Sequence, residues 1–216
     1  MDTHEFKALQ LTLKELFSNH LPANVRFYSC QISKSINLLD CEKKIVKNAI
    51  PKRVYEFSAG RMCARKSLSF FGVENFPILQ GKLGEPLWPE NITGSISHHS
   101  GMAFAVSMPL NQGYIGIDIV DLAENLPDPS AVFSDIESTA EFGENLKNRE
   151  LLLFSLKESV IKILSPLLQE YVEFKDIEII FDNNVGKVNF RTEYMNIKLF
   201  WLSHGHYAIT LAIMKN

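Results

Sequence analysis

The order of the predicted helices and strands limits this chain to a small set of folds. Apolar residues at helical spacing predict long helices at 52–71 and 150–164. Alternating or clustered apolar residues predict short strands before and after each of them. A linker at 109–113 separates the two groups. We therefore predict an α+β fold with two similar halves, residues 1–110 and 111–216, each with a small antiparallel sheet packed by helices.

The remaining elements are predicted from the same two periodicities. Glycine and proline break the chain at 81–89, which indicates an irregular loop. The acidic segment 121–150 is weakly periodic, but Ser138 and Glu141 fit a capping box and predict a short helix there. The other predicted elements are helices at 4–18 and 40–50 and strands at 25–32, 94–97, 102–108, 114–120, 172–181, 186–190, 195–202 and 207–214.

Composition excludes several classes of function. The 216 residues carry a net charge of −3, which gives no overall basic field for binding nucleic acid. No apolar run is long enough to span a bilayer. The three cysteines form no CxxC pair, and the first residues lack the basic-then-apolar order of a signal peptide. We expect a cytoplasmic protein that binds neither nucleic acid nor membrane, and whose anion sites are local clusters.

Asp118 lies in a strongly apolar strand, where an unpaired charge is costly. Successive side chains of a strand point to opposite faces, so Asp118 shares one face with Gly116 and Val120. The glycine predicts room for a ligand beside the carboxylate. The strand alone leaves two interpretations open: a strand-end aspartate bonded to a turn, and a functional carboxylate.

Glu158 lies in a helix that is apolar on two sides. A helix of this kind is expected to be sandwiched, so Lys157, Glu158 and Lys162 need partners. One interpretation is a surface pair between Glu158 and Lys162, one helical turn apart. The other is that folding brings Asp118 and Glu158 together. Two carboxylates would then make a hard-cation site of the kind that holds Mg²⁺ against phosphate oxygens.

Arginines fall inside the apolar stripe of the 52–71 helix. Arg53 and Arg61 lie in the stripe, and Arg65 follows one turn after Arg61. An inward arginine without an anion is destabilising, so either a phosphate or an internal carboxylate is required. Gly60 weakens the helix but would permit close approach by a ligand or another backbone.

Ser97 and His98 end a predicted strand. Hydroxyl and imidazole groups at a strand end suit phosphate oxygens. A lone histidine is more often structural, so both readings of His98 stay open.

Five short motifs follow one another along the chain. They are Lys52-Arg53-x-x-Glu56-Phe57-x-x-Gly60-Arg61-x-Cys63-Ala64-Arg65, Gly84-Glu85-Pro86-x-Trp88-Pro89, Gly94-Ser95-Ile96-Ser97-His98, Gly116-Ile117-Asp118-Ile119 and Phe154-Ser155-x-Lys157-Glu158-x-x-x-Lys162. Their order and spacing, over about residues 50–180, resemble the 4′-phosphopantetheinyl transferase superfamily, in the class like enterobactin synthetase component D. Each motif is weak alone, but five in order are specific.

The resemblance implies a pseudo-dimer of two α+β halves with coenzyme A in the cleft between them. It implies transfer of phosphopantetheine from coenzyme A to a serine of an apo carrier protein, with release of 3′,5′-ADP. Asp118 and Glu158 would hold Mg²⁺ on the pyrophosphate and, with Lys157, form the catalytic set. Glu158, or a metal-bound water, would help to deprotonate the serine. The residues that would bind coenzyme A are Arg53, Arg61, Lys82, Ser97, His98, Lys157 and Lys162.

Two positions depart from the family pattern. The family commonly has a glutamate two residues after the strand aspartate, where this chain has Val120, and Asp121 is expected on the opposite face. Our hypothesis is that water fills the missing metal position. Gln80 replaces a lysine often seen before the Gly-rich loop, and Lys82 could take over its phosphate contact.

The leading interpretation is an active, Mg²⁺-dependent transferase, and Val120 favours the alternative, a weakened homologue that binds coenzyme A or carrier proteins without transfer. Because carriers are usually acidic, docking is expected to use a local patch of basic and apolar residues, including part of 121–150. Fatty-acid, polyketide and peptidyl carriers, siderophore pathways included, all remain open. A monomer is expected, since two halves in one chain already build the cleft.

Overall fold

The computed structural model describes residues 6–13, 21–34, 37–126, 128–134, 137, 148–182 and 185–216. It divides into two compact units, Met1–Gln112 and Gly113–Asn216. We call them unit 1 and unit 2. Among the helices that the structure describes, none is long and apolar enough to cross a membrane.

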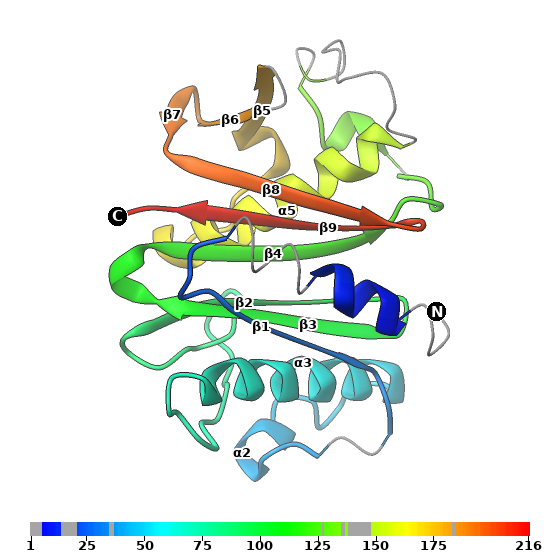
Figure 1. Ribbon diagram of the computed structural model, residues 1–216, viewed down its shortest axis with the longest axis vertical. Helices are drawn as coiled ribbons and strands as arrows, with labels where there is room; N and C mark the ends of the chain where they lie inside the picture. Colours follow the sequence, from blue (N-terminus) through cyan, green and yellow to red (C-terminus); the bar gives the residue numbers. More distant parts are fainter. Residues whose placement is uncertain are drawn as a thin grey trace. The chain divides into compact units, whose positions relative to one another are not determined.

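Unit 1 is a three-stranded antiparallel sheet covered by one long helix (Figure 1). Pro51 occupies the first turn of that helix, where its missing N–H is not needed, and a left-handed Gly72 follows the helix end. Small and apolar side chains of the helix pack on the central strand. The elements are β1 (Arg26–Gln31), α2 (Asp40–Lys43), α3 (Pro51–Ser69), β2 (Ile92–His99), β3 (Met102–Pro109) and the 3₁₀ turn η1 (Leu110–Gln112), with sheet order β1-β3-β2.

Unit 2 repeats this plan and adds a second sheet. A long helix again packs on a three-stranded antiparallel sheet, here with the order β4-β9-β8. The core of unit 2 joins the helix to both sheets. The elements are β4 (Tyr114–Asp121), η2 (Pro129–Ala131), α5 (Arg149–Leu168), η3 (Phe174–Asp176), β5 (Ile177–Asp182), β6 (Val185–Phe190), β7 (Glu193–Met195), β8 (Ile197–His204) and β9 (Tyr207–Met214).

The two units share one topology. In each unit a strand is followed by a long helix and then by a hairpin whose last strand is central and pairs antiparallel with the first strand. In this sense β1, α3, β2 and β3 correspond to β4, α5, β8 and β9. In unit 1 a helix at residues 6–13, inside the predicted helix 4–18, precedes that strand. The predicted α+β class, with two similar halves, each carrying a small antiparallel sheet and packing helices, is confirmed.

Several element bounds differ from the predictions. The second helix is a single turn, Asp40–Lys43, followed by turns, and 172–181 divides into η3 and β5. The α5 helix runs past its predicted end to Leu168, because Pro166 lies in the last turn, where its missing N–H removes one hydrogen bond only. The helix predicted around Ser138 lies outside the described residues.

Candidate active site

Side chains of the helix α5 donate hydrogen bonds to both carboxylate oxygens of Asp118. The residue lies inside β4 and is 8% exposed. Ser155 Oγ donates to Oδ2 at 2.8 Å, and Lys162 Nζ donates to Oδ1 at 2.7 Å. Lys162 Nζ also donates to the carbonyl oxygen of Ile117. The charge is paired with groups of the helix, so the alternative of a strand-end aspartate bonded to a turn is wrong.

Glu158 joins this cluster from the same helix. It is half-buried, and burial raises the pKa of its carboxyl. The Lys162 ammonium lowers that pKa, and the Asp118 carboxylate raises it. Lys162, one helical turn after Glu158, contacts Asp118 at 2.7 Å, so two distant sequence segments meet at this cluster. The lysine donates to Asp118, so the interpretation of a plain surface pair with Glu158 is incomplete.

The donor set of this cluster fits a hard divalent cation. Both candidate ligands are carboxylates, the donors that Mg²⁺ takes in small number while keeping several waters. Burial is the main cause of the raised pKa of Glu158 and the Asp118 carboxylate adds to it, and a bound cation would favour the charged form against both. Lys162 already contributes one positive charge at this place.

The two neighbouring positions contribute no further carboxylate to this cluster. Val120 is 5% exposed and belongs to the apolar core of unit 2. Asp121 ends β4, where its Oδ1 accepts from the backbone N–H of Ala123 at 2.8 Å and its Oδ2 lies 3.6 Å from His206 Nε2. Asp121 therefore caps a turn. The arrangement agrees with the prediction that Asp121 does not join Asp118.

Gly116 has a different purpose from the one predicted. A Cβ at this position would overlap the carbonyl oxygen of Ser159, which belongs to the backbone of α5. The space beside Asp118 is therefore filled by the helix and is no ligand cavity. Glycine here lets α5 approach β4 closely enough for the side chains of the helix to reach Asp118.

Lys157 is placed otherwise than predicted. Its side chain is 0% exposed, and Nζ donates to Glu137 Oε2 at 2.6 Å and to the carbonyl oxygens of Val132 and Phe174. An ammonium has three donors, and all three are used. Enclosed in this way, it presents no donor to a phosphate. We therefore correct the predicted catalytic and coenzyme A-binding role of Lys157 to a structural one.

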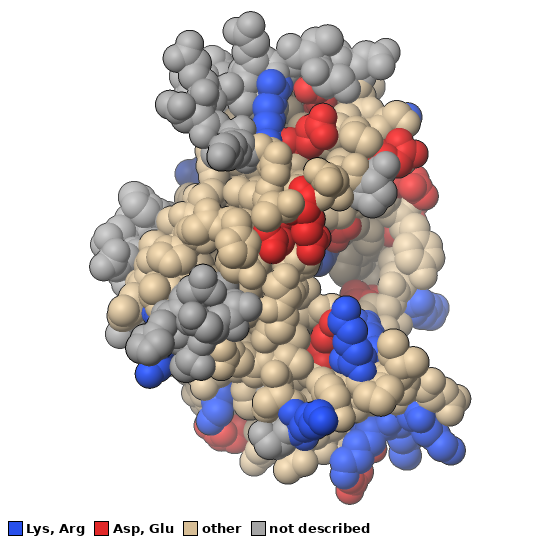
Figure 2. All heavy atoms as spheres, turned by 90° about the vertical axis from the view of Figure 1, so that its right-hand side faces the viewer, with Lys and Arg blue, Asp and Glu red and all other residues tan. Residues whose placement is uncertain are grey.

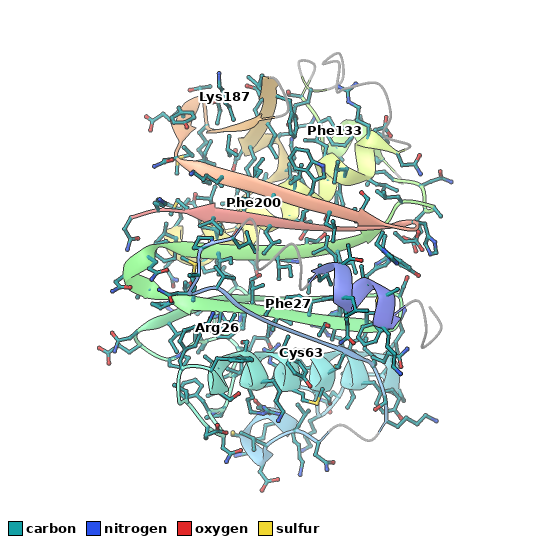
Figure 3. The ribbon with its side chains drawn as sticks, in the orientation of Figure 1. Arg26, Phe27, Cys63, Phe133, Lys187 and Phe200 are labelled. Carbon is teal, nitrogen blue, oxygen red and sulfur yellow. The ribbon has the colours of Figure 1, made fainter. Side chains whose placement is uncertain are left out.

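Glu137 is the second charged member of this buried network around Lys157, which we call the buried tie. Its carboxylate also accepts from the backbone N–H groups of Ser134 and Ile179, at 3.0 and 2.8 Å, and Ser134 Oγ accepts from the N–H of Glu137. The tie joins the segment before α5, the helix itself and the first residues of β5. Phe133, labelled in Figure 3, packs over the Lys157 ammonium.

Unit 1 contains the same tie with other residues. The fully buried carboxylate of Glu42 accepts from Arg65 of α3 at 2.6 Å. It also accepts from the backbone N–H groups of Leu39 and Ile78. A carboxylate before the helix, a cation on the helix and a backbone N–H after it thus recur in both units. The repetition supports the structural interpretation of Lys157, whose counterpart is Arg65.

Arg53 and His98, two of the predicted phosphate contacts, lie together on unit 1. Arg53 Nη1 is 3.0 Å from His98 Nε2, and His98 Nδ1 is 3.9 Å from a carboxylate oxygen of Glu56. Arg53 is exposed and His98 is partly exposed. The start of α3 and the end of β2 therefore bring a guanidinium and an imidazole to the surface as a pair.

Arg61 is buried rather than exposed. The residue is 7% exposed, its guanidinium lies 3.8 Å from the Phe57 ring centroid, and Nε donates to the carbonyl oxygen of Ile78. Among the described residues Nη2 has no hydrogen-bond partner. Burial lowers the pKa of Arg61 to about 10, against the attraction of Glu42, and Arg53 and Arg65 lower it further. A buried guanidinium of this kind is stabilised by an anion.

Two other residues predicted to bind coenzyme A, Ser97 and Lys82, also lie in unit 1. Ser97 is buried on β2, and Lys82 is exposed in the turn of the 81–89 loop. The exposed Gln80, which stands where the family often has a lysine, donates its side-chain amide to the carbonyl oxygen of Gly84 and closes the loop. The roles predicted for Ser97 and Lys82 remain predictions.

Sequence reasoning missed Ser155, Thr210 and the two carboxylates of the ties. Ser134 and Glu137 form an S-x-x-E capping box, which was visible in the sequence. Neither Ser155 nor Thr210 carries a comparable signal, since a serine in an apolar helix and a threonine in an apolar strand are ordinary.

Comparisons with known proteins identify the family of this chain. The model of the 4′-phosphopantetheinyl transferase N-terminal domain matches residues 41–107, and that of the 4′-phosphopantetheinyl transferase superfamily matches 114–212. Enterobactin synthase component D of Escherichia coli is 32% identical over 171 residues, which cover 77% of this chain and 80% of that protein. The chain belongs to the 4′-phosphopantetheinyl transferase superfamily.

Two further members of the superfamily match a shorter stretch. The transferase Svp of Streptomyces mobaraensis is 34% identical over 148 residues, and PptT of Mycobacterium tuberculosis is 31% identical over 150. These stretches cover 65% and 66% of this chain, but only 60% and 65% of the relatives. The chain thus spans less than two thirds of their length. The holo-[acyl-carrier-protein] synthase structure of Thermotoga maritima aligns with 48% of this chain and 63% of its own, at 20% identity and a TM-score of 0.38.

Proposed function

We propose that this chain transfers phosphopantetheine from coenzyme A to a serine hydroxyl of an apo carrier protein. The observation that carries the proposal is the cluster of Asp118, Glu158 and Lys162 in a chain of this superfamily. In the reaction the serine oxygen forms a bond to the phosphorus that carries pantetheine. The bond from that phosphorus to 3′,5′-ADP breaks, and the serine proton passes to a base.

The residues of unit 2 would act on the pyrophosphate and the serine. Asp118 and Glu158 would hold Mg²⁺, which supplies Lewis-acid stabilisation of the charge that develops on the leaving group. Burial raises the pKa of Glu158 above its ordinary value, which makes its carboxylate a stronger base for the serine proton. Lys162 would turn from Asp118 toward a phosphate oxygen. Such chemistry depends on alignment and charge neutralisation more than on covalent catalysis.

Unit 1 would contribute the remaining phosphate contacts. Arg53 and His98 already lie side by side, and guanidinium groups bind phosphates through two parallel hydrogen bonds. Arg61, with its unpaired buried Nη2, would gain the anion that it lacks. Ser97 and Lys82 complete the proposed set.

A second candidate function rests on Val120. Because Val120, two residues after the strand aspartate, is apolar and buried, the proposed metal site has two carboxylates. A homologue that binds coenzyme A or a carrier without transfer is consistent with such a reduced set.

Mass spectrometry of apo carrier proteins separates these two functions. Several carriers are incubated with the protein, coenzyme A and Mg²⁺, and transfer adds about 340 Da, the mass of phosphopantetheine, to the carrier. Glu158→Gln is expected to abolish the gain, whereas Glu150→Gln, which changes an exposed acid of the same helix, should keep it. If coenzyme A binds but no carrier gains mass, the non-transferring function replaces the proposed one.

The carrier is proposed to dock on a basic surface of unit 1. Around α2 and the start of α3, exposed lysines surround Ile50, which is 68% exposed. Figure 2 shows lysine and arginine side chains gathered over the end of unit 1 that carries α2. Such a patch complements an acidic carrier although the whole chain is acidic. The lysines are Lys43, Lys44, Lys47 and Lys52.

Charge reversal tests this docking surface. Lys44→Glu with Lys47→Glu should raise the KM for the carrier several-fold and leave the KM for coenzyme A unchanged. The matched control is Lys198→Glu, on an exposed position of β8. An unchanged carrier KM in the double variant would move the docking surface elsewhere. Most of 121–150, the segment predicted to take part, lies outside the described residues.

A further inference from the structure

The two units place different chemistry at corresponding positions. In unit 2 Asp118 pairs with Thr210 across β4 and β9, and Ser155 of α5 contacts both side chains. In unit 1 Cys30 pairs with Ala103 across β1 and β3, and Cys63 of α3 contacts both residues at 3.4 Å. Figure 3 labels Cys63 on α3.

The register of the two helices supports this correspondence. Lys157 lies two residues after Ser155, and its counterpart in the buried tie, Arg65, lies two residues after Cys63. The ties are alike in both units, so they belong to the scaffold. The carboxylate and hydroxyl groups occur in unit 2 alone at these positions, where the described part of unit 1 has thiols and a methyl group. Their purpose is therefore specific to unit 2.

The Ser155 hydroxyl has one possible direction. An ionised carboxylate only accepts, so the single proton of Ser155 Oγ is committed to Asp118 Oδ2. The neighbouring hydroxyls have backbone acceptors: Thr210 Oγ1 donates to the carbonyl oxygen of Ser155 at 2.9 Å, and Ser159 Oγ lies within hydrogen-bond distance of the carbonyl oxygens of Ser155 and Thr210. Ser155, Ser159 and Thr210 are each 0% exposed. A hydrogen bond in such buried surroundings is stronger than one in water.

We propose that Ser155 is a positioning residue that assigns separate roles to the two oxygens of Asp118. The buried Ser155 hydroxyl holds Oδ2, which leaves Oδ1 as the oxygen offered to the metal. Lys162, whose side chain is 26% exposed, covers Oδ1 until the metal arrives. Ser155 itself touches no ligand. This inference rests on the proposed function for the identity of the metal, but it concerns the groups of unit 2 alone.

Binding of Mn²⁺ in the absence of coenzyme A and carrier tests the proposal. Titration of the full chain, followed by the electron paramagnetic resonance of free Mn²⁺, gives the dissociation constant. Ser155→Ala should weaken binding about tenfold, because a hydrogen bond to a charged group is lost. Ser159→Ala, at an equally buried serine of the same helix whose hydroxyl has the backbone carbonyl oxygens of Ser155 and Thr210 as acceptors, should stay within about twofold. Lys162→Met should tighten Mn²⁺ binding, since the competing ammonium is gone.

Each other outcome decides against the proposal. Equal binding by Ser155→Ala and the wild type would overturn it, as would equal weakening in both serine variants, which indicates packing alone. If Ser155→Ala fails to fold, Ser155→Cys keeps nearly the same shape, replaces the hydroxyl by a weak donor and should weaken Mn²⁺ binding, and an unchanged affinity there refutes the idea. A wild type that binds no Mn²⁺ at millimolar concentration also refutes it, while the carrier mass assay still decides the proposed function separately.

Discussion

Removal of the Lys157 ammonium should destabilise unit 2 severely. In Lys157→Met the methionine fills the space, but the carboxylate of Glu137, with 0% side-chain exposure, loses its only described cation. The carbonyl oxygens of Val132 and Phe174 lose their donor as well. Breaking a buried ion pair at one partner costs about 3–5 kcal/mol, which is a large part of the stability of a domain.

A second substitution separates the lost pair from the stranded charge. Glu137→Gln added to Lys157→Met leaves an amide oxygen that accepts from one backbone N–H and an amide group that can donate to a freed carbonyl. The double variant should therefore recover about 2 kcal/mol relative to Lys157→Met, since the uncompensated charge is the larger penalty.

Urea denaturation followed by tryptophan fluorescence measures these differences. The chain has two tryptophans, Trp88 in unit 1 and Trp201 in unit 2. A Trp88→Phe background makes the fluorescence report on unit 2. The midpoint and slope of the transition give the free energy of unfolding, and an unchanged slope shows that the variants are compared fairly.

One result would refute the structural interpretation of Lys157. If Lys157→Met lowers the free energy of unfolding by less than about 1 kcal/mol yet abolishes transfer to the carrier, the ammonium acts on the ligand and the buried tie is not its purpose. Arg65→Met is the internal comparison, because Arg65 forms the corresponding tie in unit 1, and it should destabilise unit 1 similarly.

Three further results are expected. Arg61→Met should leave the free energy of unfolding within about 1 kcal/mol of the wild type or raise it, because the variant lacks a buried charge whose Nη2 has no partner among the described residues. Calorimetry should show coenzyme A binding weakened about 10- to 100-fold. A large loss of stability would contradict this reasoning. Gly116→Ala should lower the urea midpoint and reduce the free energy of unfolding by about 3 kcal/mol, because the new Cβ overlaps the Ser159 carbonyl oxygen. An unchanged midpoint would show that α5 can shift away from β4. Between pH 7 and 9 iodoacetamide should modify the exposed Cys41 and leave Cys63 unmodified, because burial raises the pKa of Cys63 and keeps its thiol neutral. Equal rates at the two cysteines in peptide mapping would contradict that.

Local sequence patterns predicted the elements that carry the site. The apolar alternation around Asp118 gives β4, and the helical spacing around Glu158 gives α5. Two charges in apolar surroundings must be paired, and they proved to lie in one cluster because β4 and α5 pack face to face. Charge burial was therefore a sound guide to which residues meet.

The direction of Lys157 could not be predicted in this way. Lys157 and Glu158 are adjacent in a helix with two apolar sides, so the local pattern does not say which of them turns inward. The decision rests with Glu137, a partner twenty residues earlier in a weakly periodic segment. Gly116 was misread for a similar reason, because only the fold shows that α5, and no ligand, fills the space above it.

The repeated tie of Glu42 and Glu137 also bears on how such a chain can change over generations. Substitutions are constrained at the same place in both units, because loss of either carboxylate leaves a buried cation without its partner. The interior of each copy is less constrained. Cys30 and Cys63 occupy in one copy the places that hold a carboxylate and a hydroxyl in the other. Unit 1 should therefore tolerate any apolar side chain of similar size at these two positions, whereas unit 2 should tolerate few substitutions at the corresponding positions.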